Sequence, residues 1–319
     1  VSGFFDKTSW RKPNNKLPED TQVWLLHEAG YSLRALGQLM EATQPMQAAL
    51  GMAIAQEKWK RAATSASNLS ELYLTIGNVK QAVTYAEQGV ELADKSEDAF
   101  QRMHRRARLA DVLHQAGKLE KSQAIFQEAE EMQKSAEPTF PLLYSVSGFH
   151  YCDMWLSQGN YAEVERRASQ TLEWVTEQHW LIDIALDQLS LGRALIGQTS
   201  EVLDTWEVLK HLNRAVASLR QAGYQEYIVR GLLARAEYFR VTGDLNKAPR
   251  DLDEAFTIAT RGGMGLHLAD CHLGYARLYL AKGDKSKARE HWKIAKDSVE
   301  KMGYHRRGKE VQELEEQLK

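Results

Sequence analysis

The stretch ASNLSELYLTIGNVKQAVTYAEQG, residues 66–89, contains the pattern that decides the fold. In its first half, small and apolar residues stand at i, i+3, i+4 and i+7, so they share one face of a helix. Gly77 follows, at a position where a left-handed helix cap suits glycine. Small residues return at helical spacing in the second half and let a second helix lie close to the first. The pattern consists of Ala66, Leu69, Ser70, Tyr73, Gly77, Ala82, Ala86 and Gly89. It predicts a helical hairpin.

The turn glycine of this hairpin recurs along the chain. It stands at Gly37, Gly77, Gly117, Gly159, Gly243 and Gly283, with spacings of 40, 40, 42, 84 and 40 residues. The double step contains a degenerate unit that begins with Leu191, Gly192 and Leu195. A fixed period of this length is typical of a stacked repeat array. We expect an all-α α-solenoid of seven hairpins, in units of about 40 residues, that forms a right-handed superhelix.

The array is expected to cover residues 21–304, with different organisation at its ends. Residues 1–20 mix aromatic, polar and proline positions and are predicted to be an N-terminal remnant or linker of a chain that continues upstream. Residues 305–319 are predicted to form a solvated C-terminal capping helix. The fifth unit is expanded around 199–210, and its second-helix pattern is assigned to Ala215, Leu219 and Ala222. The extra residues include Val202, Leu203, Trp206 and Leu209. A lengthened helix or extra turn explains them, and a protruding functional element is the alternative.

Composition gives no sign of a nucleic acid or a membrane as partner. The chain has 319 residues, and 41 basic and 43 acidic residues are mixed along it, for a formal charge of −2. No apolar run approaches the roughly 20 residues that span a bilayer. The cysteines Cys152 and Cys271 are far apart in helical patterns, which favours a reducing, cytoplasmic location over a disulfide framework.

The sequence carries no recognisable catalytic motif. It has no phosphate-binding Gly-x-x-x-x-Gly-Lys loop, no Gly-x-Ser-x-Gly elbow, no His-Glu-x-x-His and no Cys-x-x-Cys, so we expect no enzyme, no cofactor and no ATPase module within this chain. Imidazoles and carboxylates in two neighbouring units have the chemistry of zinc ligands. They are His104, Asp111, His114, His150 and Asp153. Polar residues that line a groove account for them as well, and we predict no metal.

Two resemblances follow from these residues. A small residue at the first crossing, an aromatic one turn on, glycine at the turn and alanines in the second helix resemble the tetratricopeptide repeat (TPR). The runs ASNLSELYL (66–74), GGMGLHLADCHLGYARLYL (262–280) and GYHRR (303–307) resemble the C-terminal repeat arrays of bacterial signal-transduction ATPases with numerous domains (STAND). This second resemblance implies that the chain is a sensor whose ligand contact releases a nucleotide switch in an upstream domain.

In a stacked array of helical hairpins, the first helix of each unit lines the concave wall. The residues on that wall are predicted to bind a partner, although an ordinary solvated surface has the same composition. They are Glu28, Tyr31, Thr64, Asn68, Glu71, Arg108, Asp111, His150, Asp153, Arg193, Arg230, Glu237, Arg240, Asp270 and Arg277. The basic run over 102–108 is interpreted as a solvated helix face or a patch for an acidic partner.

The function that we expect is non-catalytic binding of a protein or peptide in the concave groove. A receptor for a small molecule or signalling peptide, and a self-assembly module, are the alternatives.

Overall fold

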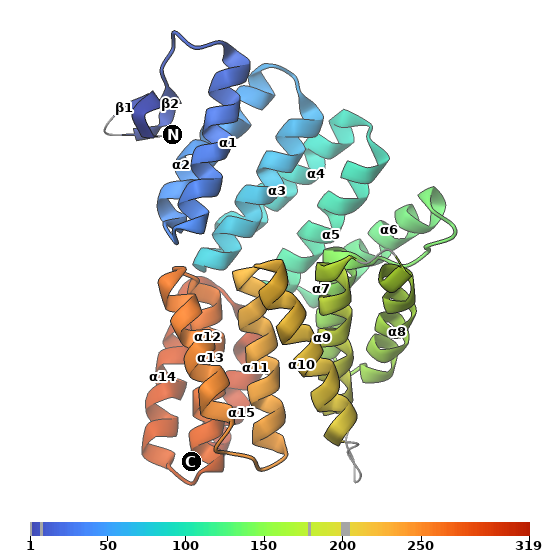
Figure 1. Cartoon of the computed structure of the whole chain (residues 1–319), viewed down its shortest axis with the longest axis vertical. Helices are drawn as coiled ribbons and strands as arrows, with labels where there is room; N and C mark the ends of the chain where they lie inside the picture. The colour runs from blue at the N-terminus through green and yellow to red at the C-terminus, as the bar shows by residue number, and fades with distance from the viewer. Residues whose placement is uncertain (1, 7–8, 178–179, 199–204) are drawn as a thin grey trace.

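The computed structural model describes residues 2–6, 9–177, 180–198 and 205–319, and most of these residues are helical (Figure 1). In this part of the chain, α1 to α14 pair in sequence order into seven hairpins, and α15 follows them. The helices are α1 (Glu19–Ala35), α2 (Leu39–Ala55), α3 (Trp59–Ile76), α4 (Val79–Ser96), α5 (Ala99–Gln115), α6 (Leu119–Ala136), α7 (Ser145–Ser157), α8 (Tyr161–Glu177), α9 (Leu181–Gly197), α10 (Thr205–Ala222), α11 (Gln225–Val241), α12 (Ala248–Arg261), α13 (Gly265–Ala281), α14 (Lys285–Met302) and α15 (Gly308–Leu318). The all-α solenoid prediction is confirmed.

The turn glycines have the predicted left-handed backbone. Their φ angles are 76° at Gly37, 95° at Gly77, 75° at Gly117, 76° at Gly159, 79° at Gly243 and 79° at Gly283. At Gly77 the backbone N–H donates to the carbonyl of Leu74 and closes α3. The side chain of Asn78 then accepts from the N–H of Gln81 and caps α4. A side chain at φ near 80° is strained, so each of these turns favours glycine.

Small residues hold the two helices of a hairpin close together. In the second unit, Ala66 and Ala82 are fully buried, and the hydroxyl of Ser70 donates to the carbonyl of Ala82 at 2.8 Å. The third unit has a hydrogen bond between the same two positions in the opposite direction, because the hydroxyl of Ser122 on the second helix donates to the carbonyl of Ala110 on the first at 2.7 Å. The hydrogen bond removes the cost of burying a hydroxyl, so serine can occupy a packing position.

The fifth unit differs from its prediction. Residues 199–204, which include Val202 and Leu203, lie outside the described residues. Trp206 and Leu209 belong to α10. This helix is 18 residues long, the same length as α4. The buried residues at its fourth, eighth and eleventh positions are Val208, Leu212 and Ala215. The same positions of α14 hold Ala288, Trp292 and Ala295. The predicted pattern of Ala215, Leu219 and Ala222 was therefore wrong by two turns, and described residues 205–210 are ordinary helix.

The N-terminal segment contains the two strands of the described structure. A short 3₁₀-helix, η1 (Ser2–Phe4), leads into β1 (Phe5–Asp6), which pairs antiparallel with β2 (Ser9–Pro13). The second strand lies against α1 and α2, and Trp10 packs on the hydrophobic core of the array. This hairpin is thus docked on the first repeat.

The array folds back on itself. Figure 1 shows α1 to α3 stacked on the end of the C-terminal hairpins, and α3 contacts α13. A 3₁₀-helix between α14 and α15, η2 (His305–Arg307), contacts α5. A Cβ added at Gly117 would lie 2.8 Å from the Cβ of His305, and one added at Gly77 would overlap Met302. The turns of the first units therefore rest on the last units, and the concave side encloses space.

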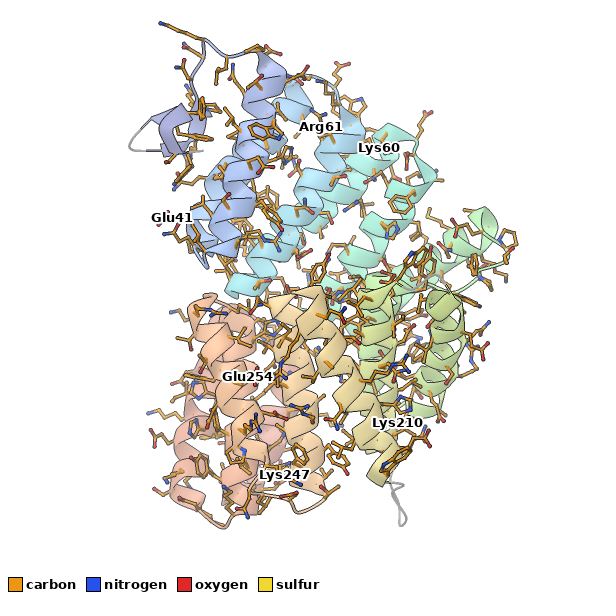
Figure 2. All side chains as sticks on the ribbon, viewed as in Figure 1. Glu41, Lys60, Arg61, Lys210, Lys247 and Glu254 are labelled. Carbon is orange, nitrogen blue, oxygen red and sulfur yellow. The ribbon has the colours of Figure 1, made fainter. Side chains whose placement is uncertain are left out.

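Exposed charges lie on the outer surface. Figure 2 labels several of these side chains, and Glu41, Lys60, Arg61, Lys210 and Lys247 are all exposed. Among the described residues, no helix combines the length and apolar character that crossing a membrane requires.

Candidate ligand-binding cavities

The fold-back places the middle of the predicted concave face inside the molecule. Asp111 on α5 is 0% exposed, and His150 and Asp153 on α7 are 3% and 1% exposed. The prediction treated these side chains as an open groove wall, and the structure shows a buried polar network instead. Carboxylates at this depth need charged partners. Removing one partner of a buried ion pair leaves the other charge unpaired and costs about 3–5 kcal/mol of stability.

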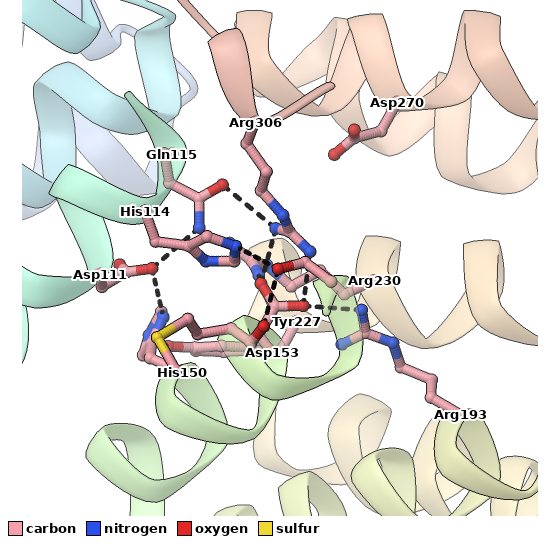
Figure 3. Close-up of polar contacts among 12 residues, drawn as sticks. Asp111, His114, Gln115, His150, Asp153, Arg193, Tyr227, Arg230, Asp270 and Arg306 are labelled. Carbon is pink, nitrogen blue, oxygen red and sulfur yellow. Dashed lines mark hydrogen bonds and ion pairs between the residues drawn. The ribbon is translucent and has the colours of Figure 1, made fainter. Parts of the chain in front are cut away.

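Asp153 is held by guanidinium groups from three parts of the chain (Figure 3). Its carboxylate lies 2.6 Å from Nη2 of Arg193 on α9, and 2.6 and 2.8 Å from Nη1 and Nη2 of Arg306 on η2. Nη1 of Arg230 on α11 lies 3.6 Å away. Burial by itself raises the pKa of Asp153, but Arg306, Arg193 and Arg230 outweigh it and hold that pKa well below its usual value. Asp153 therefore joins the fourth unit to the fifth, the sixth and the C-terminal cap.

Asp111, on α5, is the centre of a second cluster of polar side chains. Its carboxylate lies 2.9 Å from Nδ1 of His150 and 3.2 Å from Nη1 of Arg108, and it accepts a 2.9 Å hydrogen bond from the amide of Gln115. Burial opposes ionisation, yet the imidazole and the guanidiniums nearby lower the pKa of Asp111. Gln115 in turn accepts a hydrogen bond from Arg306 at 3.1 Å. The two carboxylate centres are thus connected through one amide and one guanidinium.

Two cavities lie beside this network. The smaller one has a volume of about 380 Å³ and is lined by α7, α9, α11, α13 and the C-terminal segment. Six arginines and four carboxylates contribute to its wall. They are Arg193, Arg230, Arg240, Arg277, Arg306 and Arg307, with Asp153, Glu237, Asp270 and Glu310.

The larger cavity, of about 960 Å³, lies between the first three units and the C-terminal half. Its wall carries four arginines, Arg34, Arg105, Arg108 and Arg261, but two carboxylates, Glu71 and Glu226. Tyr31, Phe100 and Tyr224 also line it, and they are 75%, 59% and 53% exposed. Both volumes are within the range of about 300–1,000 Å³ that is typical of ligand pockets.

Glu71 forms ion pairs with two of the arginines in the larger cavity. Nη2 of Arg34 lies 2.8 Å from this carboxylate, and Nη2 of Arg108 lies 3.0 Å from it. Arg105 instead donates to the amide oxygen of Gln101 at 3.0 Å, and no carboxylate pairs with it in the described part of the chain. Burial and the neighbouring charge of Arg108 lower the pKa of Arg105 to about 10. At neutral pH this cavity therefore contains a cation with no carboxylate partner.

The basic run over 102–108 divides between two surfaces of α5. Arg102 and Arg106 pair with Asp94 on the outer surface, at 3.0 and 2.9 Å. Arg105 and Arg108 line the larger cavity. Arg102 thus lies on a partly solvated face, as predicted, whereas the side chain of Arg106 is only 11% exposed. Arg105 and Arg108 face the space that an acidic ligand would occupy.

Most of the predicted concave residues line one of the two cavities. Tyr31, Asn68, Glu71, Arg108 and His150 line the larger one, whereas Asp153, Arg193, Arg230, Glu237, Arg240, Asp270 and Arg277 line the smaller one. Glu28, Thr64 and Asp111 line neither. Ion pairs join Glu71 with Arg108 and Asp153 with Arg193, while Thr64 bonds to Gln101 at 3.2 Å. These placements define candidate contacts, and binding itself stays a prediction.

The prediction did not include several residues of the cavities. Arg306, Arg307 and Glu310 belong to the segment that was predicted to be a solvated cap, yet they line the smaller cavity. The run of two arginines directly after the last repeat was the available signal. Arg105 was seen as part of a basic run, but its position next to the concave face was not recognised.

Neither a metal site nor a reactive thiol is found in these cavities. In the described ranges, no three His, Cys, Asp or Glu side chains gather in a way that would hold a metal ion. Cys152 is buried, and burial raises the pKa of its thiol to about 12. At neutral pH it is protonated and packs as a small apolar residue.

Comparison with known proteins agrees with the helical architecture. Residues 63–96 match the tetratricopeptide repeat family, and no curated protein matches the sequence. A Rap protein complexed with Competence and Sporulation Factor is similar over 94% of this chain and 100% of its own, with 14% identity and a TM-score of 0.59. A STAND protein with a tetratricopeptide repeat sensor, from Pyrococcus horikoshii, is similar over 84% of this chain and 42% of its own, with 17% identity and a TM-score of 0.53. At these identities the likeness concerns the fold. Residues 63–96 are thus similar to a tetratricopeptide repeat, and the hairpins of the chain form an α-solenoid.

Proposed function

We propose that this chain is a non-catalytic scaffold that binds an acidic peptide segment in the larger cavity, as the ligand-sensing part of a STAND-type ATPase. The observation that carries the proposal is the charge of that cavity, where four arginines face two carboxylates. Burial, together with Arg105 and Arg108, lowers the pKa of His104 to about 4, so this imidazole is neutral at pH 7. The formal charge of the cavity wall is thus 4 − 2 = +2.

The lining of the cavity suits a peptide. Arg105 offers guanidinium donors that match the two oxygens of a carboxylate. The exposed rings of Tyr31, Phe100 and Tyr224 provide apolar contact area at little conformational cost. Asn68, with an amide that both donates and accepts, suits a peptide backbone. An acidic residue next to an apolar one is therefore the ligand feature that we expect the cavity to select.

The position of the cavity supports a sensing role. Its wall combines α1, α3 and α5 of the first units with the turns before α11 and α13 of the last units. A ligand there contacts both halves of the fold-back, so it binds the closed and open arrays with different affinity and shifts their equilibrium. One solved neighbour is described as complexed with Competence and Sporulation Factor and the other as carrying a repeat sensor, and both descriptions support this proposal. We infer a protein or peptide ligand, upstream domains as intramolecular partners, and a cytoplasmic location.

The proposal is tested by selection from a random dodecapeptide display library against the whole chain. We expect enrichment of peptides with Asp or Glu beside an apolar residue. Arg105→Glu should abolish that enrichment, because it places a carboxylate where the ligand carboxylate binds. Arg102→Glu is the matched control, since it makes the same change on the outer surface of the same helix.

Two outcomes would overturn the proposal. One is a selection in which the wild-type chain enriches no acidic peptide above the unselected library. The other is an equal loss in the Arg105→Glu and Arg102→Glu variants, which would show that net charge and not the cavity determines binding. Circular dichroism of both variants establishes that they are folded.

A further inference from the structure

The smaller cavity has more positive than negative charge on its wall. Its six arginines and four carboxylates give a formal charge of 6 − 4 = +2. The excess is concentrated at Asp153, where one carboxylate faces the guanidiniums of Arg193, Arg230 and Arg306. The remaining arginines of the wall have closer to one carboxylate each, as in the pairs of Arg240 with Glu237 and of Arg277 with Glu310.

Three guanidiniums at one carboxylate leave many donors unused. Each guanidinium has five N–H donors, whereas one carboxylate accepts about four hydrogen bonds. Arg230 reaches Asp153 and Glu226 at 3.6 and 3.8 Å, distances longer than a hydrogen bond. The Nε atoms of Arg230 and Arg306 are buried and have no hydrogen-bond partner in the described structure. The cluster is therefore unsaturated in both charge and hydrogen bonds.

The protein alone stabilises the positive charge of Arg193 poorly. Burial lowers the pKa of Arg193, and the nearby charges of Arg306 and Arg230 lower it further, despite the opposing carboxylate. A bound anion would relieve this repulsion, because opposite charges in a water-poor site interact strongly. A ligand small enough to fit the cavity of about 380 Å³ could place such an anion beside these arginines.

We propose that the smaller cavity is a second binding site, which takes a small molecule with a phosphoryl group on an apolar body. A phosphate monoester is a compact dianion with three terminal oxygens, which suits three guanidiniums that converge on one point. A dicarboxylate of equal charge has its two charges at opposite ends and matches this convergence less well. The wall of the cavity also includes Leu156, Ile196, Leu233, Leu252 and Leu278, so it suits an apolar body.

This site is independent of the peptide proposed for the larger cavity. The arginines at Asp153 come from α9, α11 and η2, so a phosphoryl group would join three elements that are distant in sequence. Because a ligand that binds the folded state stabilises it, the phosphate monoester should also raise the melting temperature.

Isothermal titration calorimetry with phenyl phosphate, inorganic phosphate and succinate tests the proposal on the whole chain. We expect phenyl phosphate to bind most tightly, inorganic phosphate more weakly and succinate weakest. Arg193→Gln should weaken phenyl phosphate binding at least about tenfold, the effect of losing a charged hydrogen bond. Arg230→Gln, which removes a second guanidinium of the cluster but no contact of hydrogen-bond length to a carboxylate, should weaken it as well.

Two control variants separate the cavity from general charge effects. Arg220→Gln removes an arginine that pairs with Glu254 outside the cavity, and Arg105→Gln removes one from the larger cavity. Both should leave the affinity for phenyl phosphate within about twofold. Absence of binding by the wild-type chain, succinate binding as tight as phenyl phosphate binding, or equal losses in Arg220→Gln and Arg193→Gln would each overturn the proposal. If Arg193→Gln does not fold, Arg230→Gln gives the decision.

Discussion

His114 makes the stability of the fold sensitive to pH. Its side chain is 2% exposed, and its Nε2 lies 3.0 Å from the hydroxyl of Ser157. Burial and the charge of Arg306 lower the pKa of this imidazole to about 3. The unfolded chain binds a proton near pH 6.5, so the contribution of His114 is complete above that pH and is lost as the pH falls towards 3.

We therefore expect His114 to account for a loss of about 2 kcal/mol in the free energy of unfolding between pH 7 and pH 5. Urea unfolding followed by circular dichroism measures the loss, and in His114→Gln it should be smaller by that amount. The exposed His305→Gln variant should keep the wild-type difference. The carboxylates with lowered pKa act mainly below about pH 4.5, outside this window. An equal loss in wild type and His114→Gln would contradict the assignment.

At the residue scale, local pattern identified the carboxylates of the network better than their partners. Asp111 and Asp153 were predicted because they occupy the inner face of a first helix at helical spacing. Arg306 bonds to Asp153 across 153 residues, and no local periodicity reports a contact of that range. The burial of both carboxylates depends on how distant parts of the chain pack, so the sequence predicted their identity and not their environment.

At the scale of elements, the close contact between α3 and α13 requires a residue without a Cβ at position 265. A Cβ added at Gly265, the first residue of α13, would overlap the carbonyl oxygen of Ile76. We expect Gly265→Ala to lower the free energy of unfolding by about 1–3 kcal/mol, as overpacking does. Alanine is otherwise the better helix former, so the loss reports on the junction and not on α13.

Gly308→Ala is the matched control for this junction, because Gly308 is the first residue of α15 and a Cβ there meets nothing within 4 Å. Its effect should stay within about 1 kcal/mol and can be stabilising. Urea unfolding of both variants gives the comparison. If Gly265→Ala and Gly308→Ala have equal free energies of unfolding, the close contact between α3 and α13 contributes nothing measurable to stability.

The elements themselves were predictable where a turn requires glycine. Gly77 and Gly283 both have φ above 75°, a conformation that sequence alone indicates through the residue type. The register of α10 was not predictable in the same way, because the connection from Gly197 to Thr205 carries no turn glycine. Without that reference point, Ala215 and Val208 are both acceptable as the first crossing residue, and only packing against α9 distinguishes them.

At the scale of the whole molecule, the fold-back converts a repeat surface into two cavities. Repeat units contact mainly their neighbours, so the pitch of an array is set by many small interface angles. The sequence period determined the hairpin and could not determine whether the ends of the array meet. The closed arrangement depends instead on few specific contacts, such as the hydrogen bond of Arg306 to Gln115 and the ion pair of Arg306 with Asp153. A structure closed by few contacts can be opened by changing one of them.

Substitution of Arg306 tests whether few contacts close the array. Its guanidinium, 5% exposed, joins η2 to Asp153 on α7 and to Gln115 on α5. Arg306→Ala should destabilise the closed array by about 1.5–3 kcal/mol, because it removes the buried charged hydrogen bonds that join η2 to α7 and α5. We expect a larger radius of gyration in small-angle X-ray scattering and faster amide exchange at the end of α5. Lys309→Ala, which removes an exposed cation three residues later, should change neither. If the hairpins stay folded and Arg306→Ala keeps the wild-type radius and exchange, general packing between the two halves closes the array, and the arginine serves the smaller cavity alone.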